Sequence, residues 1–490
     1  MLSYETEAAR RKDLIDAAIA VCDSFNIHNV LVKHISSFIS EIAQSHTLPK
    51  ECHLFLILSI TGFFLDRVLV ANEWNEVTVI WPVIAAGVSS GKSAVHRYIM
   101  AELQTLINEG LLDEDYIMQI FTPEGFISTL AANDGNGLGV LDEFATLFNN
   151  YRPKDHKDVN TANMTAWLSI YDGGSVMKNL VSKKIGFDKS NVVFAGFIQP
   201  DGASQLLESK DATGLFDRFM WYFPRCDIST WNRVKLYEPM TTPKKQTPDY
   251  LDFQGIDISA DNSAAPSPTR TGERLLIPSV AEMVWKPLIN IKKRRGSIGL
   301  TFRLSVAAER IFGKFVNKIG LNYPTNTPLA GVAGKMKGFV VRCSAVIECL
   351  DRVLSPDFDP EAGWEEGDVG ISNLSIMSAI SIANMLLDVK KCWVRTPKTA
   401  KSVEEGNIAA FMAWIKIQVD TNATSSLDFT STTLLQAKKI KNPASGRSCN
   451  AEEVRAFLNN VMVSESKGKL SKKQGSTTVY TWKMNGPTPV

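Results

Sequence analysis

The chain has 490 residues, which is long enough for about three domains of ordinary size. Hydrophobic residues make up 44% of it and charged residues 21%, a composition typical of a soluble globular protein rather than a disordered or membrane-embedded one. The formal net charge of +1 gives no global support for nucleic-acid binding, so any basic surface must be local.

Cysteine and histidine usage indicates an intracellular protein without a metal centre of its own. The seven cysteines are scattered and include no CxxC pair, which suits reduced thiols, and the six histidines show no metal-ligand spacing. The charged N-terminus predicts a helix rather than a signal peptide. The most apolar run, His53 to Val70, is interrupted by Asp66 and Arg67 and is too short to span a bilayer. We therefore expect an intracellular soluble protein, with its compartment open.

Residues 1–75 are predicted to form an N-terminal helical region with three helices. The third helix, from about Lys50 to Ala71, is apolar nearly all round. Such a helix is expected in a core, so we predict that it packs against the domain that follows.

The segment that starts at Val77 predicts a strand from Val77 to Ile84, a loop of small residues and a helix from Lys92 to Asn108. The 86–93 loop, AGVSSGKS, fits a relaxed phosphate-binding loop in which alanine replaces the usual first glycine. Its backbone N–H groups would surround phosphate oxygens, Lys92 would reach the β- and γ-phosphates, and Ser93 would bind Mg²⁺. The predicted nucleotide-binding residues are Ala86, Gly87, Val88, Ser89, Ser90, Gly91, Lys92 and Ser93. The alternative is a Gly/Ser-rich turn that contains GKS by chance.

A second acidic motif is predicted 50 residues after Lys92. A helix from Pro123 to about Ala132 precedes a short buried strand, Leu138 to Leu141, which ends in Asp142 and Glu143. Asp142 would hold the Mg²⁺ shell and Glu143 would polarise the attacking water. The alternative is a pair of surface charges.

The segment after Gly174 predicts a pair of short strands or a hairpin that carries Lys178, Lys183 and Lys184. These lysines either form a solvated face or contact nucleic acid from a hairpin that projects into an oligomer channel.

A buried strand from Asn191 leads to Gln199, a polar residue placed to contact the γ-phosphate or the lytic water as a sensor. Arg218 follows among aromatic residues, before an apolar edge strand from Met220 to Phe223. Arg218 is either a structural ion pair or an arginine finger that completes a neighbouring subunit's site. These elements close the predicted ATPase core, residues 76–237.

Residues 238–278 are rich in Pro, Thr, Ser and Asp and predict a loop or linker. Residues 279–392 predict a helical domain that includes helices from Leu329 to Leu354 and from Ile371 to Lys390. Whether Lys335 or Arg342 of the first of these helices reaches the nucleotide is open at this stage.

Residues 405–485 predict a separate domain with the element order of a winged helix. Three helices (407–419, 432–437 and 451–459) lead into two strands (461–470 and 477–484) joined by a wing with Lys472 and Lys473. The segment from Gln436 to Lys483 contains ten Lys or Arg residues and three acidic residues. This local excess of positive charge is typical of a surface that binds nucleic-acid phosphates. Winged helices also serve as packing modules, so DNA binding is one of two interpretations.

Five sequence blocks resemble, in order and spacing, a family of P-loop ATPases named only as a domain of unknown function. They are TPEGFISTL, LGVLDEFATLF, WLSIYDGG, FAGFIQPD and GLFDRFMWYFP. Members of that family accompany primases and replicative helicases of phages, plasmids and integrated elements, and resemble the AAA+ and superfamily-three helicase group. The resemblance runs from about His53 to Leu387. It implies Lys92 and Ser93 on nucleotide and metal, the Asp142–Glu143 acidic motif, Gln199 as sensor and Arg218 as finger.

The sequence therefore predicts an α/β P-loop NTPase core, a parallel sheet with flanking helices, together with helical flanking domains and a C-terminal winged-helix-like domain. We expect ATP hydrolysis with Mg²⁺ coupled to DNA translocation, unwinding or remodelling, on single-stranded or forked DNA and in a homo-oligomeric ring. Priming would come from a separate primase. The alternatives are a regulatory switch ATPase whose winged helix binds DNA or a protein without unwinding, and a DNA-binding adaptor that holds nucleotide for structure only.

Overall fold

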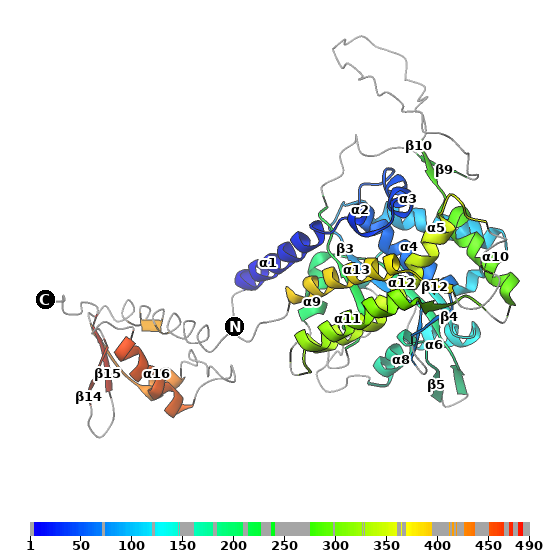
Figure 1. Ribbon diagram of the computed structural model, residues 1–490. Coiled ribbons are helices and arrows are strands. Elements are labelled where there is room, and N and C mark those ends of the chain that lie inside the picture. Colours follow the sequence, from blue (N-terminus) through cyan, green and yellow to red (C-terminus); the bar gives the residue numbers. More distant parts are fainter. Residues whose placement is uncertain are drawn as a thin grey trace, which may run out of the picture. The chain divides into compact units, whose positions relative to one another are not determined.

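The chain divides into two compact units, Met1–Val394 and Arg395–Val490, in a computed structural model of all its residues (Figure 1). The three regions predicted before residue 392 thus belong to one unit. The first unit is described at residues 4–70, 74–119, 123–145, 147, 161–179, 184–208, 214–226, 237–240, 275–296, 299–325, 327, 329–359, 364 and 369–393. The second is described at residues 411, 414, 415, 418, 426–436, 450–464, 470–473 and 479–483.

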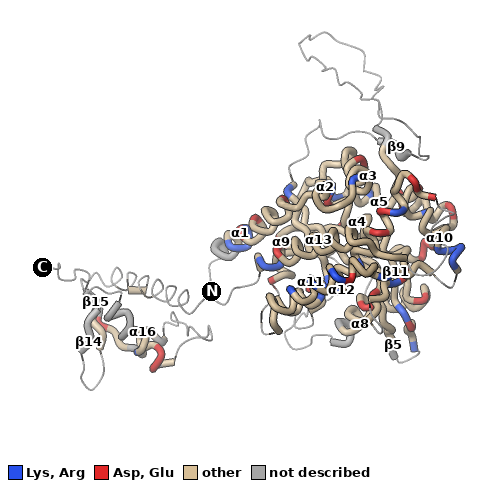
Figure 2. The backbone as a smooth tube through the Cα atoms, viewed as in Figure 1, with Lys and Arg blue, Asp and Glu red and all other residues tan. Residues whose placement is uncertain are grey.

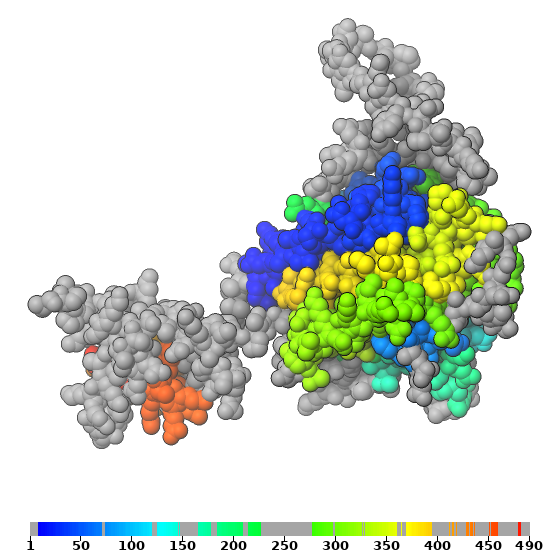
Figure 3. Space-filling model, viewed as in Figure 1, coloured from blue at the N-terminus to red at the C-terminus, as the bar shows by residue number. Residues whose placement is uncertain are grey.

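The N-terminal region is helical, as predicted, but its described part has four helices rather than three, and the last helix is shorter than expected. The helices are α1 (Tyr4–Asp23), α2 (Ile27–Val30), α3 (Lys33–Ala43) and α4 (Lys50–Phe64). The predicted helix to Ala71 is wrong beyond Phe64, because Arg67–Leu69 pairs as strand β1 in a second sheet. Every residue of α4 from Glu51 onward is buried, and α4 packs against the central sheet, which confirms its predicted core role. Figure 3 shows the N-terminal helices beside α13, which α1 contacts.

A four-stranded parallel sheet lies at the centre of the first unit. Its strands, in spatial order, are β4 (Asn136–Leu141), β7 (Asn191–Ile198), β3 (Trp81–Ala85) and β8 (Phe219–Tyr222). Nearly all residues of these strands are buried, as expected for parallel strands covered on both faces. The predicted strands before Asp142 and Gln199 and the predicted edge strand are confirmed.

The strand before the 86–93 loop differs from its prediction. The expected continuous strand from Val77 to Ile84 is divided into β2 (Asn75–Val77) and β3, which belong to different sheets. Thr78 is fully buried between them and its Oγ1 donates to the carbonyl of Gly62 at 2.7 Å. The bond holds Thr78 at the point where the chain passes from one sheet to the other. The apolar sequence pattern does not predict this break.

Helices connect the strands of the central sheet. They are α5 (Lys92–Asn108), α6 (Pro123–Ala132), α8 (Thr161–Tyr171) and α9 (Pro200–Glu208), with short 3₁₀ turns η1 (Glu114–Tyr116) and η2 (Phe216–Arg218). The predicted bounds of α5 and α6 are confirmed. The Trp167 ring stacks on both Phe126 and Phe194, with centroids 4.9 Å apart in each pair, which fixes α6 and α8 against β7.

Short strands complete the first unit. A second sheet has the order β12 (Val369–Ile371), β11 (Thr301–Leu304), β1 and β2. The predicted hairpin is confirmed as β5 (Val176–Asn179) and β6 (Lys184–Phe187), which pair antiparallel. Strands β9 (Tyr237–Met240) and β10 (Leu275–Pro278) pair in parallel, so the predicted loop at 238–278 is wrong at both of its ends. The rest of that predicted linker lies outside the described residues.

The helical domain predicted after residue 279 packs directly on the core. It contains a π-helical turn η4 (Ala281–Trp285) and helices α10 (Lys286–Arg295), α11 (Val306–Asn322), α12 (Ala330–Val353) and α13 (Asn373–Lys391). Ser305 and Ser372 cap α11 and α13 with their hydroxyl groups, which accept from Ala308 N and Ser375 N. The two long predicted helices are confirmed within two residues. Figure 1 shows α12 and α13 side by side.

The second unit has a three-stranded antiparallel sheet and helices. Strand β13 (Ser426–Thr430) precedes α15 (Ser431–Gln436) and α16 (Ala451–Ser464), which are followed by β14 (Leu470–Lys473) and β15 (Val479–Lys483) in the order β13-β15-β14. The prediction of a strand from residue 461 is wrong, because α16 continues to Ser464, and β13 was not predicted. The buried Phe411 and Phe429 lie in an aromatic cluster with Tyr480, which forms this unit's core.

None of the helices in the described parts of the chain is long and apolar enough to cross a membrane.

Candidate functional site

The 86–93 loop joins β3 to α5 at the carboxyl end of the parallel sheet. Ser89 and Gly91 adopt φ angles of 60° and 91°, so the loop turns sharply twice before the helix begins. Among the described residues, the backbone N–H groups from Gly87 to Gly91 donate to no protein acceptor. Free N–H groups in series before a helix N-terminus form a site for an anion.

Two hydrogen bonds inside the core fix this loop. Ala86 is fully buried, and its N–H donates to Ile198 O of β7 at 3.0 Å. Ser90 is also buried, and its Oγ donates to Gly87 O at 2.8 Å. The alanine that departs from the usual pattern therefore lies in a buried position beside the end of β7.

Ser93 and Asp142 lie together, as the two predicted motifs require. Ser93 Oγ donates to Asp142 Oδ2 at 2.9 Å, and Oδ1 is 3.3 Å away. The two residues are 49 positions apart in sequence, and both side chains reach solvent at the carboxyl edge of the sheet. Lys92, in the first turn of α5, forms no ion pair with any described residue. Lys92 directly precedes Ser93, whose hydroxyl group bonds to the Asp142 carboxylate.

The strand order places Gln199 between the two motifs. β7 lies between β3 and β4, and its last carbonyls accept from Ala86 N and, at 2.7 Å, from Phe144 N. Gln199 follows directly and is exposed. Glu143 is half-buried, and its Oε1 accepts from Ala145 N at 3.2 Å. The sheet thus brings Lys92, Ser93, Asp142, Glu143 and Gln199 to one edge.

The donor set suits a magnesium ion that keeps most of its water and phosphate ligands. No group of three or more His, Cys, Asp and Glu side chains gathers within the described residues. Ser93 and Asp142 supply one hydroxyl and one carboxylate. Mg²⁺ is bound in nucleotide sites by one or two protein oxygens together with substrate phosphates, so these residues fit it.

Arg218 lies away from this edge, and its contacts favour the ion-pair interpretation. It directly precedes β8, whose first residue Phe219 pairs with Trp81 at the start of β3. Arg218 is therefore at the amino edge of the sheet, opposite the 86–93 loop. It is buried, and its Nη2 lies 3.1 Å from Asp172 Oδ2. To act as a finger, this guanidinium would have to leave Asp172 and reach another subunit.

The lysines proposed to contact nucleic acid fall in three different surroundings. Lys184 is exposed at the start of β6, and Lys178 lies in β5 opposite Ile185. Lys183 lies outside the described residues. Lys472 and Lys473 form the end of β14 in the second unit, opposite Tyr480 and Val479 of β15. Figure 2 shows a further basic segment at the end of α10, where Lys293 and its neighbours follow one another.

Three residues near the 86–93 loop carry no sequence signal. Thr47, between α3 and α4, donates from Oγ1 to Ser90 O at 2.8 Å. His96 Nε2 lies 3.2 Å from Val140 O and ties α5 to β4. Arg97 donates from Nε to Ser93 O at 3.2 Å. Thr47 comes from a part of the chain 43 residues away, so no local motif could have found it.

Two buried histidines support the α3–α4 connection behind this loop. The His46 ring lies 4.9 Å from the His53 ring and 5.3 Å from the Tyr98 ring of α5. Burial lowers the pKa of His46 to about 4. Burial, and then the neighbouring His46, lower the pKa of His53 to about 3. Both imidazoles are therefore neutral in the folded chain at physiological pH.

We expect these histidines to destabilise the folded chain in acid. The unfolded chain takes up protons near pH 6.5 and the folded chain does not, so stability is complete above pH 6.5 and falls as the pH approaches the folded pKa values. Between pH 7.5 and 5, one such imidazole accounts for roughly 2 kcal/mol. Urea unfolding of the wild type and of His53→Phe at both pH values measures this. The variant should lose roughly 2 kcal/mol less than the wild type; equal losses would contradict the prediction.

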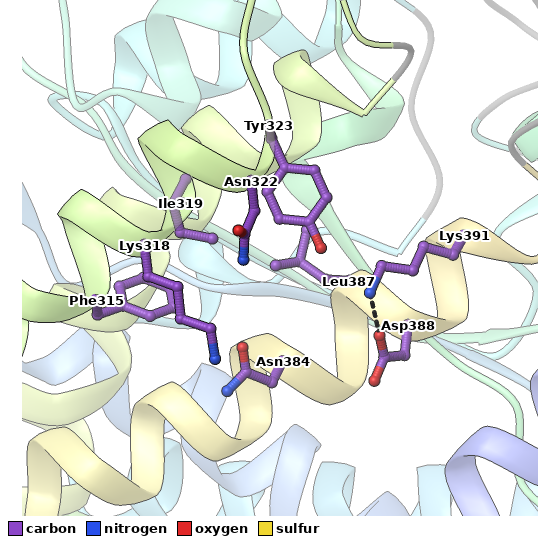
Figure 4. Close-up of a pocket in the computed structure, with 9 residues that line it drawn as sticks. All are labelled: Phe315, Lys318, Ile319, Asn322, Tyr323, Asn384, Leu387, Asp388 and Lys391. Carbon is purple, nitrogen blue, oxygen red and sulfur yellow. Dashed lines mark hydrogen bonds and ion pairs between the residues drawn. The ribbon is translucent and has the colours of Figure 1, made fainter.

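Two hollows lie away from the 86–93 loop. One, of about 290 Å³, lies between α11 and α13. Figure 4 shows Lys318, Asn322 and Asn384 pointing toward one another there, with Tyr323 beside Lys391. The other, of about 390 Å³, lies at the amino edge of the sheet. None of the catalytic, nucleotide-binding or nucleic-acid-binding residues predicted from the sequence lines either hollow.

A comparison with protein-family models finds no match, and a search of curated proteins finds no relative. The fold that is established is an α/β core with parallel sheets and packed helical regions.

Proposed function

We propose that this chain is a Mg²⁺-dependent ATPase whose site is the carboxyl edge of the parallel sheet. The observation that carries the proposal is the 2.9 Å contact between Ser93 and Asp142, together with the N–H groups from Gly87 to Gly91, which donate to no described residue. Binding of phosphates at a helix N-terminus and of a metal by a hydroxyl–carboxylate pair is the arrangement of P-loop NTPases. Strand order supports it, because the two motifs come from strands separated only by β7.

In this proposal the chain's residues have distinct tasks. The N–H groups of the loop bind the α- and β-phosphates, and Lys92 binds the β- and γ-phosphates. Ser93 and Asp142 would hold Mg²⁺, which supplies neutralisation of phosphate charge when bound. Glu143 exchanges its bond from Ala145 N for one from the attacking water, and Gln199 positions that water against the γ-phosphate.

We further propose that hydrolysis drives DNA translocation, unwinding or remodelling within a ring, as the resemblance to primase- and helicase-associated ATPases implies. The exposed Lys184 and Met177 of the β5–β6 hairpin offer a charged and an apolar contact to a strand of DNA. The helix and strand order of the second unit, with its antiparallel sheet, fits a winged helix carrying Lys472 and Lys473. In the ring, Arg218 would leave Asp172 to complete a neighbour's site.

The second candidate function is a nucleotide-dependent switch. The observation that favours it is the position of Arg218, which is buried on Asp172 of its own chain. The adjacent Asp217 pairs with Lys390 of α13 at 2.8 Å, so the helical domain is tied to the segment that precedes β8. A change in this segment would move the helices without any need for unwinding.

Steady-state ATP hydrolysis with and without single-stranded DNA separates the two functions. A motor should hydrolyse faster with DNA, and the triple variant Lys178→Glu, Lys183→Glu, Lys184→Glu should lose this stimulation while it keeps its basal rate. A matched triple variant on exposed helix surfaces, Lys293→Glu, Lys314→Glu, Lys318→Glu, should retain it. A rate of ATP hydrolysis that does not change with DNA would favour the switch. A hairpin variant that DNA still stimulates would contradict the role of the hairpin.

A further inference from the structure

The connection between α3 and α4 contacts the 86–93 loop through one side chain. Thr47 is half-buried, and its Oγ1 donates to Ser90 O at 2.8 Å. Thr47 is also close to the next residue, Gly91, because a Cβ added to Gly91 would overlap Thr47 Oγ1. Thr47 therefore lies directly against the loop, and the N-terminal region forms part of its wall.

This hydrogen bond determines how one peptide group of the loop is oriented. In a trans peptide the carbonyl and the following N–H point in opposite directions. Thr47 holds Ser90 O on its own side, so the N–H of Gly91 points to the other side. Gly91 N donates to no acceptor among the described residues. The φ angle of Gly91, one of the two angles that orient this peptide, is 91°, which lies outside the usual helix and strand regions, so regular secondary structure does not fix the peptide.

The hydroxyl group itself is held in place by buried neighbours. Thr47 lies between His46, which is 9% exposed, and Leu48, which is 3% exposed. The His46 ring packs between His53 of α4 and Tyr98 of α5, with centroids 4.9 and 5.3 Å away. The backbone around Thr47 is thus anchored to two helices, one of which begins at the loop itself. A donor on such a support is pre-organised.

We propose that Thr47 is a positioning residue for nucleotide binding, which acts by turning the Gly91 N–H toward the phosphates. This inference rests on the proposed ATPase function and names a residue that the sequence motifs do not include. Thr47 does not touch the nucleotide. It acts through the Ser90–Gly91 peptide, and its loss lets that peptide rotate away from the phosphates.

Two substitutions separate this role from simple packing. Thr47→Val keeps the shape and removes the donor, whereas Thr47→Ser keeps the donor. We expect the Kd of Mg²⁺–ATP, measured with a non-hydrolysable analogue, to rise roughly five- to tenfold in Thr47→Val and to stay within about twofold in Thr47→Ser. Thr105→Val is the matched control, because it removes a Thr hydroxyl from α5 whose one partner among the described residues is Ala101 O. The melting temperature without nucleotide is measured for all four proteins and should vary little.

The outcomes are distinct. Unchanged affinity in Thr47→Val, or an equal loss in Thr47→Val and Thr47→Ser, would overturn the positioning role while wild-type binding upheld the proposed function. A folded wild type that binds no nucleotide would overturn both. Restored affinity in Thr47→Ser beside a loss in Thr47→Val is the result that the hydrogen bond requires.

Discussion

Replacement of Glu143 by glutamine should lower the rate of ATP hydrolysis by about 10²- to 10⁴-fold, the usual contribution of a general base. The carboxylate lies directly after Asp142 at the end of β4 and is half-buried, so it can accept a proton from a water near the γ-phosphate. Glutamine keeps the size and the hydrogen bond from Ala145 N but is no base. Nucleotide affinity should therefore change little.

The measurement is kcat for hydrolysis together with the Kd of Mg²⁺–ATP for the wild type and Glu143→Gln. Asp201→Asn, in the first turn of α9, is a matched control with an exposed carboxylate. It should hydrolyse at the wild-type rate. A near-wild-type kcat in Glu143→Gln would show that Glu143 is not the general base. Ser93 and Asp142, the residues assigned to Mg²⁺, would then have to be tested by themselves.

Replacement of Arg342 by methionine should lower the free energy of unfolding by about 3–5 kcal/mol, as expected when one partner of a buried ion pair is removed. Arg342 of α12 is 3% exposed. Its Nε and Nη2 lie 2.8 and 2.6 Å from Glu76 Oε2, and its Nη1 donates to Tyr171 O at 2.9 Å. The guanidinium also lies over the Tyr171 ring, 4.2 Å from its centroid. The variant leaves a carboxylate and a carbonyl without their cation.

Urea unfolding measures this effect, with Arg310→Met as the control. Arg310 lies on the neighbouring helix α11 and is exposed, so the same substitution there should cost less than about 1 kcal/mol. The double variant Arg342→Met, Glu76→Gln should recover part of the loss, because it removes the unpaired charge. Equal effects of the two single variants would show that the buried network does not hold α12 to the core.

Short sequence patterns correctly predicted the helices and strands of the core whose bounds depend on neighbouring residues. The bounds of α5 follow from the 86–93 loop before it and from Gly110, with a φ of 66°, after it. Proline at the first position fixed the start of α6. The apolar runs before Asp142 and Gln199 marked β4 and β7, because strands buried on both faces are apolar throughout. These elements suffice to bring Ser93 and Asp142 together.

What the sequence could not reveal depends on contacts between distant segments. Strand β1 has three residues and pairs with β11, more than 230 positions later, so its local sequence predicts the end of a helix instead. Thr47 and Arg342 act through carbonyls and carboxylates far along the chain. The ion pair of Arg218 joins it to Asp172, 46 positions earlier, and the sequence around Asp172 has no charge pattern that would predict the contact. Contacts between distant segments leave no periodic pattern in the local sequence, so the sequence alone does not predict them.

The most direct test of the ATPase assignment is a calorimetric titration of the full chain with ATP in the presence of Mg²⁺, for the wild type beside Lys92→Ala. Lys92 makes no ion pair with the described residues, so its loss should leave the fold intact and remove the charge that holds the β- and γ-phosphates. The account predicts saturable binding at one site by the wild type and little or none by the variant. A folded wild type that binds no ATP, or a variant that binds it as tightly, would contradict the account.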